Sequence, residues 1–154
     1  MPECRPVAQV TASATHTVSA PPERVLGFLR DYQQSRPSIL PDSYSRYRVE
    51  EGGEGGGTVF SYHFKSGPTE RDFRMRAEES DGRLLERDEL SSFTTTWTVA
   101  QAATGSTVTV ESSWVGGGGI GGFFERVFAP MGLRRVYGEM LERLAAAVTD
   151  GPVS

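Results

Sequence analysis

The chain has 154 residues, of which 37% are hydrophobic and 23% are charged, and its formal net charge is −4. These fractions are typical of a globular protein and exclude wholesale disorder, and the length predicts one domain over residues 1–154. The acidic balance also excludes a general nucleic-acid binder, because the release of counterions from a phosphate backbone requires a basic face.

Few residues of the chain could hold a metal or form a disulfide. Cys4 is the only cysteine, and the histidines are His16 and His63 alone, so an internal disulfide and a Cys/His zinc site are both excluded. Residues 1–6 lack the basic and apolar parts of a signal peptide, and no apolar run approaches the ~20 residues of a membrane span. We therefore expect a cytoplasmic protein with no stable membrane insertion.

The first fifty residues predict a strand followed by two short helical pieces. Residues 7–19 are rich in Val and Thr, which favours a strand. Pro21 and Pro22 then stand where proline begins a helix, and Glu23 suits the first helical turn. A second short helical or irregular piece ends between Pro37 and Pro41.

The middle of the chain predicts a run of antiparallel strands. Apolar and polar side chains alternate with period two, which is typical of a sheet with one wet face and one buried face. Short turns separate the strands, so neighbours in sequence should pair as a meander. Residues 83–89 form a weaker strand, whose register leaves open whether Glu86 or Arg87 faces inward. The inward phase of the other strands contains Phe60, Tyr62, Phe64, Phe73, Met75, Phe93, Trp97, Ser112 and Trp114.

Apolar residues recur at helical spacing from Phe123 to Val148 and predict a long C-terminal helix, kinked near Pro130 and Gly132. A helix is about 10 Å wide, so the sheet must curl to bury its apolar face against it. Such a shell can be hollow and lined for an apolar ligand, although the pattern alone favours a filled core. The helical residues expected at this lining are Phe124, Phe128, Met131 and Tyr137.

The glycines form two clusters. Residues 116–122 satisfy G-x-G-x-x-G after a strand, but only one helix follows them, so the second strand of a dinucleotide-binding unit is missing and we reject that function. We predict instead that one or both of the clusters, at 52–57 and 116–122, flank a cavity entrance and move more than the sheet.

Several segments resemble the helix-grip superfamily, also called START/Bet v 1-like or SRPBCC. The segments that carry the resemblance are residues 18–25, residues 28–31, the pair of segments 51–53 and 57–59, and the C-terminal residues 123–130, 133–135 and 140–144. They are most similar to the bacterial polyketide cyclase/dehydrase-like subgroup. The resemblance implies an α+β fold with a curved antiparallel sheet of about seven strands around the C-terminal helix. It also implies an internal apolar cavity, with no metal and no cofactor.

The functions within that superfamily leave three interpretations open. The first is a protein, monomeric or homodimeric, that binds a hydrophobic aromatic polyketide-like or lipid-like molecule. The alternative is a cofactor-independent polyketide aromatase/cyclase, in which orientation and one acid or base promote aldol cyclisation and dehydration. A self-protection or stress-response protein that sequesters a metabolite is the third. No catalytic residue is assigned, and Tyr62 is the only candidate because its hydroxyl should lie at the cavity.

Overall fold

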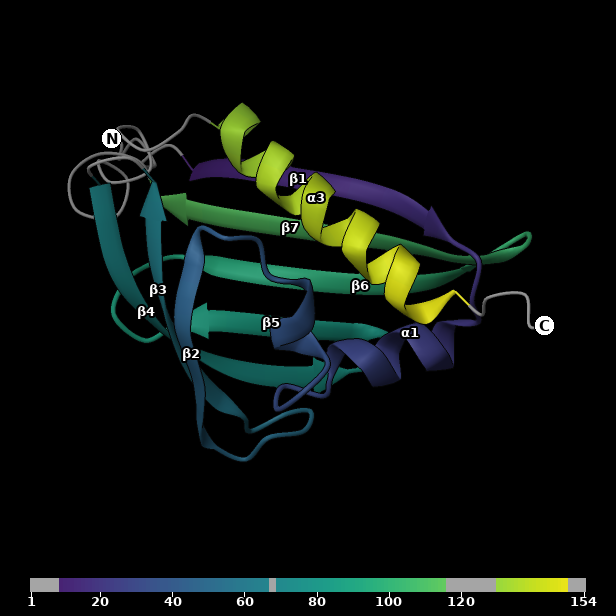
Figure 1. The fold of residues 1–154 in the computed structure, drawn as a ribbon, viewed down its shortest axis with the longest axis horizontal. Coiled ribbons are helices and arrows are strands. Elements are labelled where there is room, and N and C mark those ends of the chain that lie inside the picture. Colours follow the sequence, from purple (N-terminus) through teal and green to yellow (C-terminus); the bar gives the residue numbers. More distant parts are fainter. Residues whose placement is uncertain (1–8, 67–68, 116–129, 150–154) are drawn as a thin grey trace, which may run out of the picture.

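The computed structural model describes residues 9–66, 69–115 and 130–149 (Figure 1). One short α-helix and a single 3-10 turn follow the first strand, six strands come next, and a long helix ends the described chain. The elements are β1 (Gln9–Val18), α1 (Pro22–Leu29), η1 (Arg36–Ile39), β2 (Tyr44–Glu51), β3 (Val59–Ser66), β4 (Thr69–Ser80), β5 (Arg83–Asp88), β6 (Thr94–Ala102), β7 (Gly105–Val115) and α3 (Pro130–Val148).

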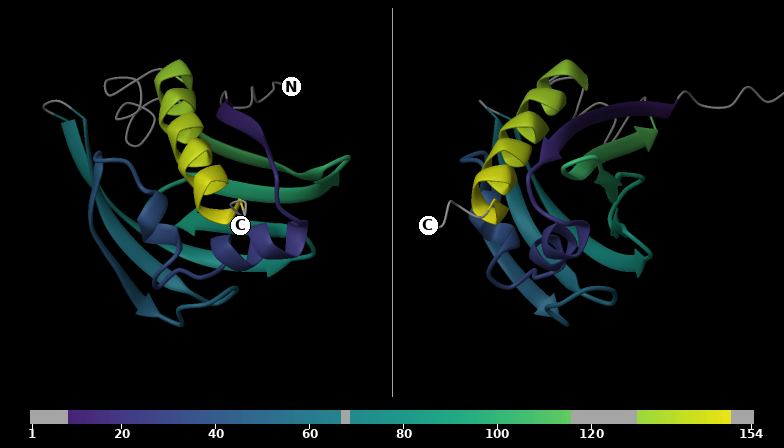
Figure 2. Two further views of the ribbon diagram at one scale, coloured as in Figure 1. Left: turned by 45° about the vertical axis from the view of Figure 1, so that its right-hand side comes forward. Right: turned by 90° about the vertical axis from the view of Figure 1, so that its right-hand side faces the viewer.

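All of these strands belong to one antiparallel, seven-stranded sheet in the order β1-β7-β6-β5-β4-β3-β2. Strands β2 to β7 form the predicted meander, and β1 joins it by pairing with β7. The sheet is curved, and α3 lies along its concave face, with α1 near the C-terminal end of α3 (Figures 1 and 2). The predicted helix-grip architecture is therefore confirmed.

The alternation of side chains in the sequence decides which face of the sheet is buried. In β7, Val108, Val110, Ser112 and Trp114 are buried, whereas the residues between them are partly or fully exposed. Strand β5 follows the same rule with Leu84, Glu86 and Asp88 inward, so the open question of its register is answered in favour of Glu86. The inward phases of the strands and one side of α3 form a single core.

The described part of α3 runs from Pro130 to Val148. The helix contacts β1, η1 and α1. The predicted helical stretch over residues 123–129 lies outside the described residues, so the kink predicted near Pro130 and Gly132 stays a prediction. Within the described residues, no helix is long and apolar enough to cross a membrane.

The glycine-rich loop between β2 and β3 is held firmly in place. The Gly55 amide donates to the Arg30 carbonyl at 2.8 Å, and the Tyr32 amide donates to the Gly53 carbonyl at 3.1 Å. The Gly57 amide also donates to the Ala77 carbonyl at 2.9 Å. These bonds tie the 52–57 loop to the end of α1 and to β4. That the loop flanks a cavity entrance and moves more than the sheet stays a prediction. The second cluster, 116–122, lies outside the described residues.

Candidate functional site

An interior cavity lies between α3 and the concave face of the sheet, and its free volume is about 30 Å³. Because one water needs roughly 10–15 Å³, the space holds about two waters in this conformation. The interior is therefore nearly filled. The cavity is lined by Arg36, Leu40, Tyr44, Tyr47, Phe60, Tyr62, Met75, Glu86, Thr95, Trp97, Tyr137 and Met140.

A smaller void of about 10 Å³ lies beside the first, and the two share Tyr44, Tyr62 and Tyr137 as walls. The remaining walls of this smaller void are apolar, namely Phe64, Phe73, Phe93 and Leu133. The three tyrosines therefore separate a region with charged groups from a region that is entirely hydrophobic.

Aromatic rings pack against one another along the inner face of β2, β3 and β4. Tyr62 stacks on Phe73 with ring centroids 5.2 Å apart, and Tyr44 meets Tyr62 at 5.1 Å. At the other side, Tyr32 stacks on Phe60 at 4.9 Å. Such pairs contribute about 0.5–1.5 kcal/mol each beyond the burial of their area, so the rings also fix the shape of the cavity wall.

Arg36 and Glu86 form the charged end of the cavity. Nη2 of Arg36 lies 2.8 Å from Oε2 of Glu86, and the exposed fractions of the two side chains are 7% and 4%. The Tyr32 hydroxyl donates to Oε2 of Glu86 at 2.7 Å, and Nη1 of Arg36 donates to the Leu29 carbonyl at 2.9 Å. Arg36 also stacks on the ring of Trp97, with Cζ 4.8 Å from the centroid. Both carboxylate oxygens of Glu86 are thus occupied.

The surroundings of these groups fix their protonation. Burial alone would lower the pKa of Arg36, but the Glu86 carboxylate beside it raises that pKa above its ordinary value. Burial, and then the Glu86 charge, raises the pKa of Tyr32 well above 10. Arg36 therefore stays charged and Tyr32 stays a neutral hydrogen-bond donor at neutral pH.

A second polar group joins α3 to the sheet. The Thr95 and Ser112 hydroxyls lie 2.6 Å apart, and the Ser112 hydroxyl also hydrogen-bonds to the Tyr137 hydroxyl. Burial raises the pKa of Tyr137 to about 12, although the bonds to Ser112 and Thr95 act in the opposite direction. These three hydroxyls satisfy one another inside the core.

Three further polar atoms at the cavity have no such partner. Among the described residues, the hydroxyls of Tyr44 and Tyr62 make no hydrogen bond, and the buried indole nitrogen of Trp97 has no acceptor. Burial is the first cause that raises the pKa values of Tyr44 and Tyr62 well above 10, so both phenols stay protonated at neutral pH.

The structure gathers most of the lining residues predicted from the sequence. Phe60, Tyr62, Met75, Trp97 and Tyr137 line the larger void, and Phe64, Phe73 and Phe93 line the smaller one. Ser112 contacts Tyr137, and Trp114 is a buried core residue that lines neither void. Phe124 and Phe128 lie outside the described residues, as does the side chain of Met131.

Sequence reasoning did not assign several of the lining residues. Arg36 lies in a proline-containing turn that carried no signal of burial. Tyr44 and Tyr47 are three residues apart, and both reach the cavity because the pairing of β2 with β3 shifts between Ser45 and Arg48. The inward phase of β6 did contain a signal for Thr95, since Thr95 lies between Phe93 and Trp97. The residues that were not assigned are Arg36, Leu40, Tyr44, Tyr47, Glu86, Thr95, Leu133 and Met140.

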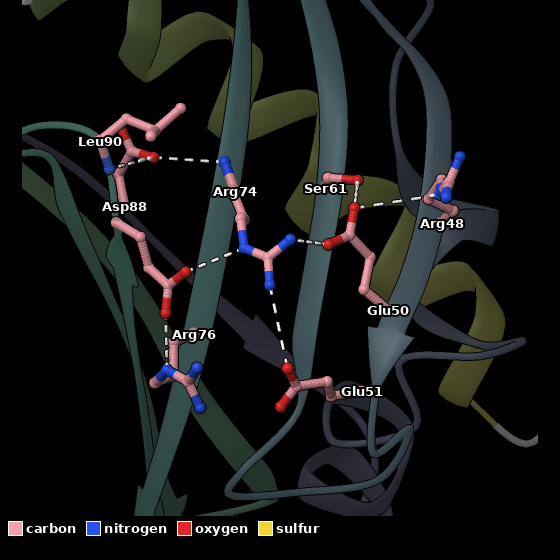
Figure 3. A network of polar contacts seen from close by, with 9 residues as sticks. Arg48, Glu50, Glu51, Ser61, Arg74, Arg76, Asp88 and Leu90 are labelled. Atoms are coloured by element: carbon pink, nitrogen blue, oxygen red, sulfur yellow. Dashed lines mark hydrogen bonds and ion pairs between the residues drawn. The ribbon is translucent and has the colours of Figure 1, made fainter.

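The outer face of the sheet carries a separate network of charges (Figure 3). Arg74 lies among Glu50, Glu51 and Glu89, and Nε of Arg74 donates to Glu89 at 2.9 Å. His63 also lies on this face and contacts Asp72 and Glu70 at 2.6 and 2.7 Å. Within the described part of the chain, no group of three or more His, Cys, Asp or Glu side chains is placed to hold a metal ion.

A curved antiparallel sheet that encloses a long C-terminal helix, with an aromatic space between them, defines the Bet v 1-like helix-grip class of proteins. The chain belongs to the family described as "polyketide cyclase / dehydrase and lipid transport", whose model matches residues 9–149. No match was found among proteins of curated function.

Solved structures share this fold. The solution structure of the KanY protein is 43% identical, with a TM-score of 0.84, and the match covers 92% of this chain and 98% of that one. The di-domain ARO/CYC BexL from the BE-7585A biosynthetic pathway is 17% identical with a TM-score of 0.71, over 96% of this chain and 52% of that one. The major latex-like protein 151 of Panax ginseng is 10% identical with a TM-score of 0.68, over 91% and 97%. The last two similarities concern the fold alone.

Proposed function

We propose that this protein binds a hydrophobic small molecule, aromatic polyketide-like or lipid-like, in the cavity under α3. The observation that carries the proposal is the convergence of aromatic side chains on one interior space, with polar atoms only at defined points of its wall. Ligand sites are typically apolar concavities with a few placed polar groups. Family membership supports the same function. The cytoplasmic location and the oligomeric state, monomer or homodimer, stay predictions.

Binding requires the cavity to enlarge, since about 30 Å³ does not hold an aromatic molecule. Most of the wall consists of strands that are hydrogen-bonded to their neighbours and cannot separate without breaking the sheet. The remaining wall comes from Tyr137 and Met140 on α3 and from Arg36 and Leu40 at η1, and Arg36 is fixed by its ion pair with Glu86. The seam between Met140 and Leu40, which lies just before β2, is therefore the part of the wall that can move. We therefore place the movement that admits a ligand at this seam.

The test is titration with the apolar dye N-phenyl-1-naphthylamine, followed by fluorescence and by native mass spectrometry for stoichiometry. We expect saturable binding of one dye per chain, and tighter binding in Met140→Ala, because this substitution enlarges the cavity. Leu144→Ala is the matched control, since Leu144 is buried on the same helix but lines neither void. Both substitutions remove a buried side chain at a cost of about 2–5 kcal/mol, so only the cavity distinguishes them. No saturable binding by the wild type and Met140→Ala would overturn the proposal.

A polyketide aromatase/cyclase is the second candidate, and the neutral phenols at the cavity favour it. An aldol step needs a donor to the carbonyl oxygen and a base for the carbon-bound proton. Tyr44 and Tyr62 supply donors, but Glu86 is occupied by Arg36 and Tyr32, and His63 lies on the outer face. Because a free base is missing among the described lining residues, binding is the preferred function. Tyr62→Phe tests the cyclase: an unchanged product distribution in a reconstituted synthase assay removes its candidate acid. Sequestration for self-protection uses the same cavity and predicts binding without turnover.

A further inference from the structure

The wall of the cavity contains hydrogen-bond donors that have no acceptor among the described residues. Trp97 is 1% exposed, and its indole N–H can only donate, yet no acceptor among the described residues reaches it. Buried polar groups in folded proteins almost always have a partner, so an orphan donor in a cavity wall needs an explanation.

The neighbouring tyrosines add to the surplus of donors. The hydroxyls of Tyr44 and Tyr62 have no partner in the described part of the chain, and both residues line the same void as Trp97. Each phenol is neutral at physiological pH, because burial opposes its ionisation. The wall therefore holds three hydrogen-bond donors without a protein acceptor.

The acceptors near the cavity are already used. Oε2 of Glu86 accepts from Tyr32, and Oε1 of Glu86 accepts from Arg36. The hydroxyls of Thr95, Ser112 and Tyr137 bond to one another. The side-chain acceptors of Glu86, Thr95, Ser112 and Tyr137 are thus engaged. The phenol oxygens of Tyr44 and Tyr62 can accept as well as donate, but neither accepts from the Trp97 indole in this structure.

We propose that the cavity selects ligands that carry a hydrogen-bond-accepting oxygen, such as the carbonyl of an aromatic ketone, and that Trp97 is a specificity-determining residue. This inference rests on the proposed binding function and narrows its ligand class. A saturated hydrocarbon chain would cover the three donors without pairing them. A ring ketone supplies one acceptor with two lone pairs, in a shape that fits between stacked aromatic walls. Sites built to hydrogen-bond a ligand discriminate strongly against analogues that lack the partner group.

The experiment compares 1-indanone with indane, which share a ring skeleton and differ by one carbonyl oxygen. Dissociation constants are measured by calorimetry for the wild type, Trp97→Phe and Trp114→Phe. Trp114 is the matched control because it is a buried tryptophan that lines neither void. The ratio of the two constants within each variant is the readout, because differences in the hydration of the ligands cancel when the ratios are compared.

We expect Trp97→Phe to reduce the preference for indanone about 3- to 10-fold, in line with the loss of one buried hydrogen bond, while Trp114→Phe retains the wild-type ratio. Equal ratios in the wild type and Trp97→Phe, with both ligands bound, overturn this inference and leave the binding function intact. Binding of neither ligand overturns the binding function and the inference together.

A measurement on the wild type covers the case in which Trp97→Phe does not fold. The two tryptophan indole N–H resonances are followed by ¹H–¹⁵N NMR during titration with each ligand. Indanone should shift the Trp97 resonance downfield, as a new hydrogen bond does, and indane should not. The Trp114 resonance serves as the internal reference. Identical responses of Trp97 to both ligands contradict the inference.

Discussion

Arg36 and Glu86 lie 50 positions apart in the sequence and form an ion pair in which Nη2 and Oε2 are 2.8 Å apart. The pair links η1, which follows the first helix, to β5 in the middle of the sheet. Tyr32, the Leu29 carbonyl and the ring of Trp97 complete the contacts of the guanidinium and the carboxylate. One end of the cavity is therefore a fixed, fully paired charge cluster, and its other end is hydrophobic.

Glu86→Gln tests the importance of this pair. The substitution keeps the shape of the side chain but leaves the Arg36 charge buried without a counter-charge, and breaking a buried pair costs about 3–5 kcal/mol. We expect a loss of that size in the free energy of unfolding, measured by urea denaturation. Glu78→Gln is the control, because Glu78 pairs with Arg87 on the exposed face at 3.4 Å, and such pairs contribute about 0–1 kcal/mol.

The double variant Arg36→Met/Glu86→Leu separates charge from packing. Replacing both partners of a buried pair by apolar groups is often neutral or stabilising, so we expect the double variant to recover most of the stability that Glu86→Gln loses. A loss below about 1 kcal/mol in Glu86→Gln would contradict the assigned burial of the pair.

The tyrosines give a prediction about alkaline pH. Burial is the first cause that raises the pKa values of all five tyrosines above the ordinary value near 10, to about 12 for Tyr137. Above pH 10 the folded state then holds protons that the unfolded state has lost, so the free energy of unfolding falls as pH rises. The stabilisation is complete below pH 10 and disappears as pH passes through the folded-state values.

Absorbance at 295 nm and far-UV circular dichroism, recorded on the same samples, test this predicted fall in the free energy of unfolding above pH 10. We expect no tyrosinate signal near pH 10, and a single rise at higher pH that coincides with the loss of circular dichroism. Tyr137→Phe should weaken the pH dependence of stability by about 1.4 kcal/mol per pH unit between pH 10 and 12. A tyrosine that ionises near pH 10 while the circular dichroism is intact would show that it is not buried as described.

The sequence predicts the buried face well wherever alternation is regular and local. Every second residue is buried in β7, and in β6 as far as Val99, and the aromatic lining follows from this rule. The burial of β5 alternates as well, but Leu84 and Leu85 are adjacent, so the sequence alone does not indicate which phase is buried. Alternation itself fails in β2, where the shift in pairing with β3 turns both Tyr44 and Tyr47 inward.

The charged end of the cavity lies beyond such local rules. Glu86 is buried because Arg36 meets it from another element, and no periodicity in either segment carries information about a partner so far away. Charged residues are rarely buried unless they are paired. The sequence alone therefore favours a surface position for a charged residue such as Glu86. The volume of the cavity is likewise a result of how side chains interlock, which composition does not determine.

Arg143 lies at the seam where we place ligand entry. Its Nη1 donates to the Leu40 carbonyl at 2.9 Å, and its Nη2 pairs with Glu139 at 2.7 Å on the same helix. We expect Arg143→Met to accelerate dye association several-fold in stopped-flow fluorescence, with less than about 1 kcal/mol lost in stability, because a single partly exposed hydrogen bond is removed. Glu139→Gln, which leaves the bond to Leu40 in place, should retain the wild-type rate. Equal rates in both variants would place entry elsewhere.

Two glycines predict opposite effects of the same substitution. At Gly138, inside α3, a Cβ would meet nothing within 4 Å, so Gly138→Ala should raise the free energy of unfolding by about 0.5–1 kcal/mol through helix propensity. At Gly105, φ is +142° and a Cβ would lie 2.2 Å from the Val18 carbonyl oxygen, which belongs to the backbone and cannot rotate away. Gly105→Ala should therefore lower stability by about 2 kcal/mol or more, because the β6–β7 turn and the end of β1 must both shift. Urea denaturation of the two variants beside the wild type measures both changes, and a tolerated Gly105→Ala would show that β1 does not pack against this turn.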